Sequence, residues 1–228
     1  MRPHGDADEK HPGWRKGYIM FAPDEGTPLV LVPSSPLCGH VLAAAGFQFS
    51  AVESPIMDEP WGLSCQVGPV QRAEALAYFR ARSVSDRRPG AMVLAATTLV
   101  VVGDRVFGAP FGRREAGEML HTVSGKRHAV VTGVALVHEA RRLLASETTF
   151  VTMRAIPEGE IASYLASGNW LGVAGAYATP EIAGRFVTHL EGSFSNLLGL
   201  PVELVVNMLA RIDSRCEAYD PPLAAASA

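Results

Sequence analysis

The chain contains 228 residues, of which 48% are hydrophobic and 19% charged, and its formal net charge is −3 at pH 7. This balance supplies enough apolar surface for the buried core of a single domain, which excludes a largely disordered chain. It also excludes the broad basic field that draws a protein to nucleic acid or to an anionic membrane, so we expect neither as a partner.

The first predicted elements are a buried strand and a helix that follows it closely. Leu29–Val32 is a continuous apolar run, typical of a strand that is covered on both faces. The segment Ser34-Ser35-Pro36 comes next. Serine before proline is typical of a helix start, and Gly46 marks the end of this helix.

Strands and helices continue to alternate as far as residue 212, which predicts an α/β fold with a mixed sheet. Further strands are expected over residues 47–52, 92–102, 105–107, 128–136 and 148–153, and helices over residues 70–82, 114–123, 157–166 and 201–212. The stretch between the last two strands carries Glu139, Arg141 and Arg142, and we interpret it as a connector. One domain over residues 27–212 is expected, with a flexible arm over 1–26 and a flexible tail over 213–228.

Cysteine spacing and hydropathy indicate the compartment. Cys38, Cys65 and Cys216 form no CxxC pair, so we expect neither a structural zinc site nor a disulfide framework. No stretch approaches the roughly 18 uninterrupted apolar residues of a membrane span, and the N-terminal residues are polar rather than signal-like. We therefore expect a cytoplasmic protein.

Four segments, taken in order, resemble the Maf family of nucleotide pyrophosphatases. They are the Ser34-Ser35-Pro36 junction, residues 124–136 (SGKRHAVVTGVAL), residues 174–177 (AGAY) and residues 191–201 (EGSFSNLLGLP). The resemblance covers about residues 29–212. It implies a Maf-like mixed sheet bent around a central cleft, with helices outside. It also implies cleavage of nucleoside triphosphates to the monophosphate and pyrophosphate.

This sequence departs from the family pattern at most of the charged positions that the resemblance implies. Leu37 and Cys38 stand where the family has two arginines, and Thr97 stands where it has an aspartate that acts as base or metal ligand. The expected lysines and a glutamine are matched by Glu74, Ala109, Val173 and Pro180. Ser35 and the acidic pair Asp58-Glu59 are retained.

These replacements predict that ordinary triphosphate hydrolysis is lost. A charge-assisted hydrogen bond contributes about 1.5–3 kcal/mol, so four lost contacts approach the roughly 8 kcal/mol of micromolar binding. The cleft is then either reused for a less charged, nucleoside-like or other small molecule, or it is non-catalytic. In the second case the chain is a pseudoenzyme that binds a nucleotide weakly, or it pairs with another protein or with a second copy of itself.

The alternative is residual hydrolysis of nucleoside triphosphates. It requires that other bases reach the cleft, and the candidates are Arg113, Arg114, Lys126 and Arg185. No cofactor is expected otherwise, and Mg²⁺ only in this case, because phosphoryl transfer depends on positioned charge.

The candidate site residues follow from these comparisons with the family pattern. Glu59, Thr97 and Cys38 are the catalytic candidates, and Ser35, Thr98, Tyr177 and Asn196 are the ligand-binding candidates. For Cys38 the alternative is a small buried hydrophobe, and for Ser35 it is a plain helix N-cap. We expect the cleft between the Ser34-Ser35-Pro36 junction and residues 175–199, with Thr97 on its floor.

Overall fold

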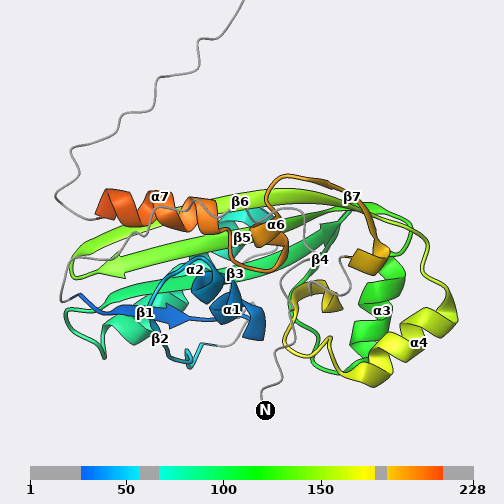
Figure 1. Ribbon diagram of the computed structural model, residues 1–228, viewed down its shortest axis with the longest axis horizontal. Helices are drawn as coiled ribbons and strands as arrows, with labels where there is room; N and C mark the ends of the chain where they lie inside the picture. The colour runs from blue at the N-terminus through cyan, green and yellow to red at the C-terminus, as the bar shows by residue number, and fades with distance from the viewer. Residues whose placement is uncertain (1–26, 57–66, 178–183, 213–228) are drawn as a thin grey trace, which may run out of the picture.

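A computed structural model describes residues 27–56, 67–177 and 184–212 (Figure 1). The predicted arm and tail lie outside these residues. Helices and 3₁₀ turns alternate with strands along the chain, which confirms the α/β class. The elements are β1 Leu29–Val32, α1 Pro36–Ala44, β2 Ser50–Ala51, α2 Pro69–Ser85, β3 Met92–Val102, β4 Arg105–Phe107, α3 Arg113–Val123, β5 Arg127–His138, β6 Arg141–Met153, α4 Glu158–Ser167, η1 Ala174–Ala176, β7 Val187–Glu191, α6 Phe194–Leu197 and α7 Val202–Ile212.

The strands form one mixed seven-stranded sheet in the order β2-β1-β3-β5-β6-β7, with β4 paired to β3. β1 is parallel to both β2 and β3, whereas the pairs β3–β5, β5–β6 and β6–β7 are antiparallel. The predicted connector over residues 137–147 is wrong. β5 and β6 pair from Arg127↔Thr152 to His138↔Arg141, so the charged residues of this stretch belong to a long hairpin. Their charged side chains are exposed, which a strand with one solvated face permits.

Alternate residues of β3 face different helices, as the pleat requires. Leu94 and Ala96 pack with α1 and α7, whereas Val93 and Ala95 pack against α2. Because β3 is covered on both faces, it is an almost continuous apolar run, and its bounds are those expected from the sequence.

A second part of the core lies toward one end of the long strands. There α3, α4 and η1 pack together around Leu120, Tyr164 and Tyr177, against the strand residues Val100 and Val151. Figure 1 shows α3 and α4 at this end, and α1, α2 and α7 at the other. The long strands of β3, β5 and β6 therefore join two groups of helices.

One glycine lets α2 lie directly on the sheet. A Cβ placed on Gly133 would lie 2.2 Å from the carbonyl carbon of Ala73 and 2.3 Å from the amide nitrogen of Glu74. These are backbone atoms of α2 and cannot turn aside as a side chain can. The absence of a side chain at Gly133 therefore sets how closely α2 approaches β5.

One edge of β3 changes partner along its length. β1 pairs with Met92–Ala95 of this strand, and β4 pairs with Val100–Val102. The residues between, Ala96–Leu99, are paired with β5 on the other edge. The chain leaves β1 and β4 on either side of this gap. Such switch points in a sheet are where ligands commonly bind.

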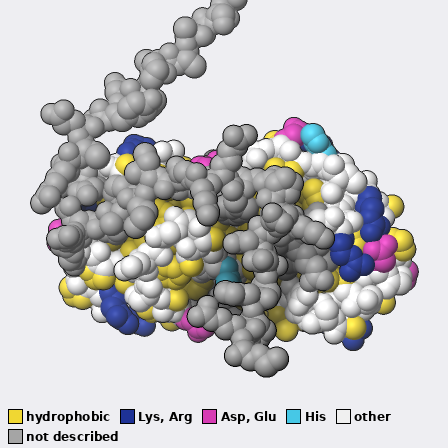
Figure 2. Space-filling view, in the orientation of Figure 1, with side chains coloured by type: hydrophobic (Ala, Val, Ile, Leu, Met, Phe, Trp, Pro, Cys, Tyr) yellow, Lys and Arg dark blue, Asp and Glu magenta, His cyan; other side chains and the backbone are white. Residues whose placement is uncertain are grey.

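The surface carries its charges in small groups. On the face shown in Figure 2, several lysine and arginine side chains gather beside acidic side chains at the right-hand end, and others stand singly elsewhere. Among the residues that the structure describes, no helix has the length and apolar character needed to cross a membrane.

We predict that Gly133→Ala destabilises the fold by about 1–3 kcal/mol or more, because the new methyl group forces α2 away from the sheet. Equilibrium urea unfolding measures this change. Gly159→Ala is the matched control, since a Cβ there meets no heavy atom within 4 Å and Gly159 lies within α4. The control should be neutral or stabilising. Equal stability of the two variants would contradict the close approach of α2.

Candidate functional site

The gap beside β3 opens into a cleft of about 810 Å³, within the size range of small-molecule sites. Its walls come from the β1–α1 junction, the segment after β2, α2, the β4–α3 connector and α3, and Leu99 of β3 lies on its floor. The described lining residues are Pro33, Ser34, Ser35, Pro36, Glu53, Ser54, Ile56, Arg72, Arg80, Leu99, Val106, Phe107, Gly108, Ala109, Pro110, Phe111, Glu115, Met119 and Gly172.

Arg80 connects α2 to the β1–α1 junction. Its side chain is 7% exposed, and Nη2 donates a hydrogen bond to the carbonyl oxygen of Pro33 at 2.6 Å. This carbonyl immediately precedes Ser34 and Ser35. The bond therefore holds a cationic side chain beside the start of α1.

Arg72 is a second cation on the same wall. It precedes Arg80 by about 12 Å along the helix axis, at 1.5 Å per residue. Its Nε atom is buried and has no hydrogen-bond partner among the residues described. A buried guanidinium nitrogen without a partner is costly, so Arg72 is suited to an anionic ligand oxygen that would satisfy it.

The start of α1 adds hydroxyl groups and a helix N-terminus. Ser35 has extended backbone geometry at the N-cap, and Pro36 follows at the first helical position. The side chain of Ser35 caps no backbone N–H; its Oγ lies 3.5 Å from Sγ of Cys38. With Ser34, it lines the cleft. A helix N-terminus favours negative charge, so this wall complements the two arginines.

Thr97 and Thr98 lie on opposite faces of β3. Thr98 Oγ1 is within hydrogen-bond distance of Thr132 Oγ1, at 2.9 Å, and donates to the carbonyl oxygen of Gly199 at 3.4 Å. Thr97 is opposite Gly133, the residue that contacts α2, and its buried Oγ1 has no partner in the described part of the chain. The expectation that Thr97 forms the floor of the cleft is wrong: α2 lies over Thr97 and Gly133, and Leu99, two residues farther along the same face of β3, lines the cleft instead.

The expected position of the cleft also needs correction. The described residues of 175–199, which are 175–177 and 184–199, do not line it; one of them, Gly199, borders a separate narrow crevice with Thr98, Val173 and Ala174. Ser34, Ser35 and Ala109 border both spaces. The other walls of the cleft are formed instead by α2 and by the residues after β4.

Cys38 is a buried thiol in the first turn of α1. Its Sγ donates to the carbonyl oxygen of Gly199 at 3.5 Å, and its side chain is 0% exposed. It does not line the cleft. This environment is that of a small core residue linking α1 to the turn before α7.

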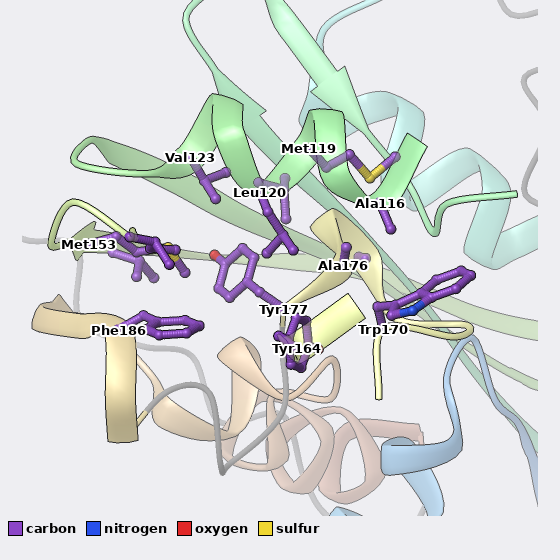
Figure 3. Packing of buried hydrophobic residues seen from close by; sticks show 14 of the residues in the cluster. Ala116, Met119, Leu120, Val123, Met153, Tyr164, Trp170, Ala176, Tyr177 and Phe186 are labelled. Carbon is purple, nitrogen blue, oxygen red and sulfur yellow. The ribbon is translucent and has the colours of Figure 1, made fainter. Parts of the chain in front are cut away.

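Tyr177 lies within the core beside α3 and α4. Figure 3 shows its ring near Leu120, Met153 and Phe186. Its hydroxyl forms a buried hydrogen bond of 2.5 Å with Nε2 of His128. Burial raises the pKa of Tyr177 above its usual range and lowers the pKa of His128 from 6.5 to about 4. The pair is therefore neutral near pH 7.

Asn196 fastens the turn before α7 to the sheet. Its side chain is 0% exposed, and Nδ2 donates to the carbonyl oxygen of Val130 at 3.1 Å and to Thr149 Oγ1 at 2.9 Å. These bonds cross from α6 to β5 and β6. Neither Asn196 nor Tyr177 lines the cleft.

The remaining residues singled out from the sequence are either described residues that do not line the cleft or residues outside the described part of the chain. Glu59, Asp58 and Pro180 belong to the latter. None of the predicted compensating bases lines the cleft; Arg114 and Arg185, for example, form exposed ion pairs with Glu118 and Glu160. Glu74 does not line it either.

Sequence reasoning missed Arg72, Arg80 and Glu53. The signal available for the arginines was their place on the predicted helix over 70–82, combined with the loss of the family's arginines and lysines at Leu37, Cys38, Ala109 and Val173. Without the register of that helix on the sheet, however, nothing distinguishes Arg72 and Arg80 from the exposed Arg82.

The described residues do not fit a metal ion by themselves. Within residues 27–56, 67–177 and 184–212, no group of three His, Cys, Asp or Glu side chains is placed to hold one. The carboxylates that line the cleft are Glu53 and Glu115, and Glu115 already accepts the backbone N–H of Phe111 at 2.7 Å. The chemistry derived below therefore uses side chains alone.

Comparison with known proteins gives matches to one family along nearly the whole described chain. A family model described as Maf-like protein matches residues 28–212. A dTTP/UTP pyrophosphatase of Ruminiclostridium cellulolyticum is 34% identical over 189 residues, covering 82% of this chain and 97% of the relative. A dTTP/UTP pyrophosphatase of Symbiobacterium thermophilum is 38% identical over 183 residues, covering 80% and 93%.

The two threonines of β3 should respond differently to valine. Thr98→Val removes the hydrogen bonds to Thr132 and Gly199 and should cost about 1–2 kcal/mol of the free energy of unfolding. Thr97→Val removes an unpartnered buried hydroxyl at nearly constant volume and should be neutral or stabilise by up to about 1 kcal/mol. Urea unfolding of both variants measures this, and a larger loss for Thr97→Val would contradict the assignment of faces.

The free energy of unfolding should decrease as the pH is lowered, because folding lowers the pKa of His128. Its folded pKa of about 4 lies below the 6.5 of the unfolded chain, so below pH 6.5 the unfolded state binds more protons. The contribution is complete above pH 6.5 and is lost as pH falls toward 4, amounting to about 2 kcal/mol at pH 5. Between pH 7 and 5, the free energy of unfolding measured in urea should therefore change less with pH for His128→Gln than for the unaltered chain. An equal dependence of the free energy of unfolding on pH in the two proteins would contradict this role of His128.

Proposed function

The chain belongs to the Maf-like protein family, and from this membership we propose that it is a nucleotide pyrophosphatase that acts on pyrimidine nucleoside triphosphates. The reaction consumes one water molecule, cleaves the bond between the α- and β-phosphates, and releases a nucleoside monophosphate and pyrophosphate. The names of the relatives support the substrate class, because they match this chain over nearly their whole length.

The observation that carries the proposal is the convergence of cations on the cleft from a single helix. Arg72 and Arg80 occupy one wall, and the N-terminus of α1 with Ser34 and Ser35 occupies the adjoining wall. The arginines offer the planar, multiple donors that suit phosphate oxygens. These groups supply positive charge from positions other than those of the family pattern, where Leu37, Cys38 and Ala109 stand.

The two arginines differ in how they are held before substrate binds. Arg80 is held by its bond to Pro33, so its charge is positioned before substrate arrives, which is the condition under which electrostatic stabilisation is most effective. Arg72 has a donor nitrogen that lacks a partner among the described residues and would gain one from a phosphate oxygen. The two guanidinium groups would offset the negative charge that develops on the leaving pyrophosphate.

This proposal is favoured over reuse of the cleft for an uncharged ligand. An uncharged molecule without an acceptor would leave the buried Nε of Arg72 with no hydrogen-bond partner among the described residues, which costs free energy. The apolar replacements at Ala109 and Val173 border the cleft and the crevice respectively, and they reduce the number of phosphate contacts without removing the arginine pair.

The test is direct measurement of products. The purified chain, supplied with Mg²⁺ or Mn²⁺, should convert UTP or dTTP to the monophosphate and pyrophosphate. Arg72→Gln should lower kcat/KM by about 10- to 100-fold, the equivalent of one charge-assisted hydrogen bond. Arg82→Gln is the control, because Arg82 lies on the same helix but pairs with Asp86 and does not line the cleft.

Two outcomes would contradict the proposal. The first is no pyrophosphate from any nucleoside triphosphate with either metal. The second is unchanged kcat/KM for Arg72→Gln, which would show that turnover does not use this wall of the cleft. Before the activities are compared, Arg72→Gln and Arg82→Gln should be shown to unfold at similar urea concentrations, so that a loss of activity does not come from unfolding.

A further inference from the structure

Phe111 is the most exposed large hydrophobic side chain among the described residues. It is 73% exposed and lines the cleft, immediately after Ala109 and Pro110. A phenylalanine ring left in water forgoes about 1.5–3 kcal/mol of burial free energy. Single exposed apolar residues are common on proteins, but an aromatic ring at a cleft that also holds arginines is placed where a ligand can cover it.

The backbone of Phe111 is held in place, so its exposure does not come from a loose loop end. Its N–H donates to Oε2 of Glu115 at 2.7 Å, across the first turn of α3. Gly112 then serves as the N-cap of this helix. On the preceding side Pro110 is buried. A ring carried on a fixed backbone makes a binding surface at low entropic cost.

Phe194 is also exposed but lies outside the cleft, and three other exposed or cleft-lining rings each have an aromatic or cationic neighbour. The guanidinium of Arg127 lies 4.1 Å from the ring centroid of Phe150, and that of Arg105 lies 4.7 Å from the centroid of Phe107. The ring of Phe79 contacts Tyr78 at 5.7 Å between centroids. Phe111 has no such aromatic or cationic neighbour within the described residues, so its face is open to a ligand.

We propose that Phe111 is the stacking platform for the base of a nucleotide whose phosphates lie at Arg72 and Arg80. This inference rests on the proposed function and names the base subsite of the same cleft. The arginines come from the α2 wall and Phe111 from the β4–α3 wall, so one elongated ligand can contact both. Stacking on a phenylalanine face depends little on which base is bound. Phe111 therefore contributes affinity for a base-bearing substrate and does not by itself read the base.

The experiment separates base from phosphate by comparing UTP with inorganic tripolyphosphate. Binding of each is measured by titration calorimetry in EDTA, where metal-dependent turnover cannot interfere. Phe111→Ala should weaken UTP binding by about 5- to 100-fold, the range of a lost base–aromatic stack, and leave tripolyphosphate binding unchanged. Phe111→Trp should retain UTP binding. Phe79→Ala, an exposed phenylalanine on α2 outside the cleft, should change neither.

The outcomes distinguish this inference from the proposed function. Unchanged UTP binding in Phe111→Ala, or an equal loss of UTP and tripolyphosphate binding, would overturn the stacking role. If the unaltered chain hydrolyses UTP while Phe111→Ala keeps its KM, the stacking role is overturned and the pyrophosphatase function stands. If UTP binds in a Phe111-dependent way but is never hydrolysed, the base subsite stands and the hydrolytic function fails. If UTP does not bind the unaltered chain, the stacking role is also overturned.

Discussion

Strand β3 exchanges one partner for another along a single edge, and the candidate site depends on this exchange. β1 runs parallel to its first residues and β4 antiparallel to its last, so a gap remains beside Ala96–Leu99. The chain must leave the sheet on both sides of the gap. It leaves β1 through Ser34 and Ser35 into α1, and it leaves β4 through Gly108 and Ala109 toward α3. The polar groups of both exits therefore border the same cleft.

Close packing of α2 on the sheet supplies the charges of that cleft. Because Gly133 has no side chain, the backbone of α2 approaches β5 directly. The buried face of α2 is accordingly rich in alanine, and the long side chains of Arg72 and Arg80 extend from the helix toward the gap beside β3. The same tight packing leaves Thr97 between helix and sheet, where its hydroxyl lacks a partner among the described residues. Stability and charge placement at this site thus depend on the same contact.

The site candidates that sequence reasoning selected fall into two groups when placed in space. Ser35 borders the cleft, as a helix start beside a strand end must. Tyr177 and Asn196 instead hold core segments together through His128 and Thr149. Motif residues of this kind are shared within a family for structural reasons as well as for contact with a ligand. A motif alone does not separate the two roles, because both require the same residue in the same segment.

Local pattern by itself determined the α/β class, the bounds of β3 and β4, and the start of α1, since apolar runs, turns and helix starts are properties of neighbouring residues. It could not determine which arginine of α2 reaches the cleft, or that Leu99 rather than Thr97 forms its floor. Those depend on the register of α2 over Gly133 and on where along β3 the pairing with β1 ends and the pairing with β4 begins. Both are contacts between residues far apart in the chain, so only the tertiary structure decided them.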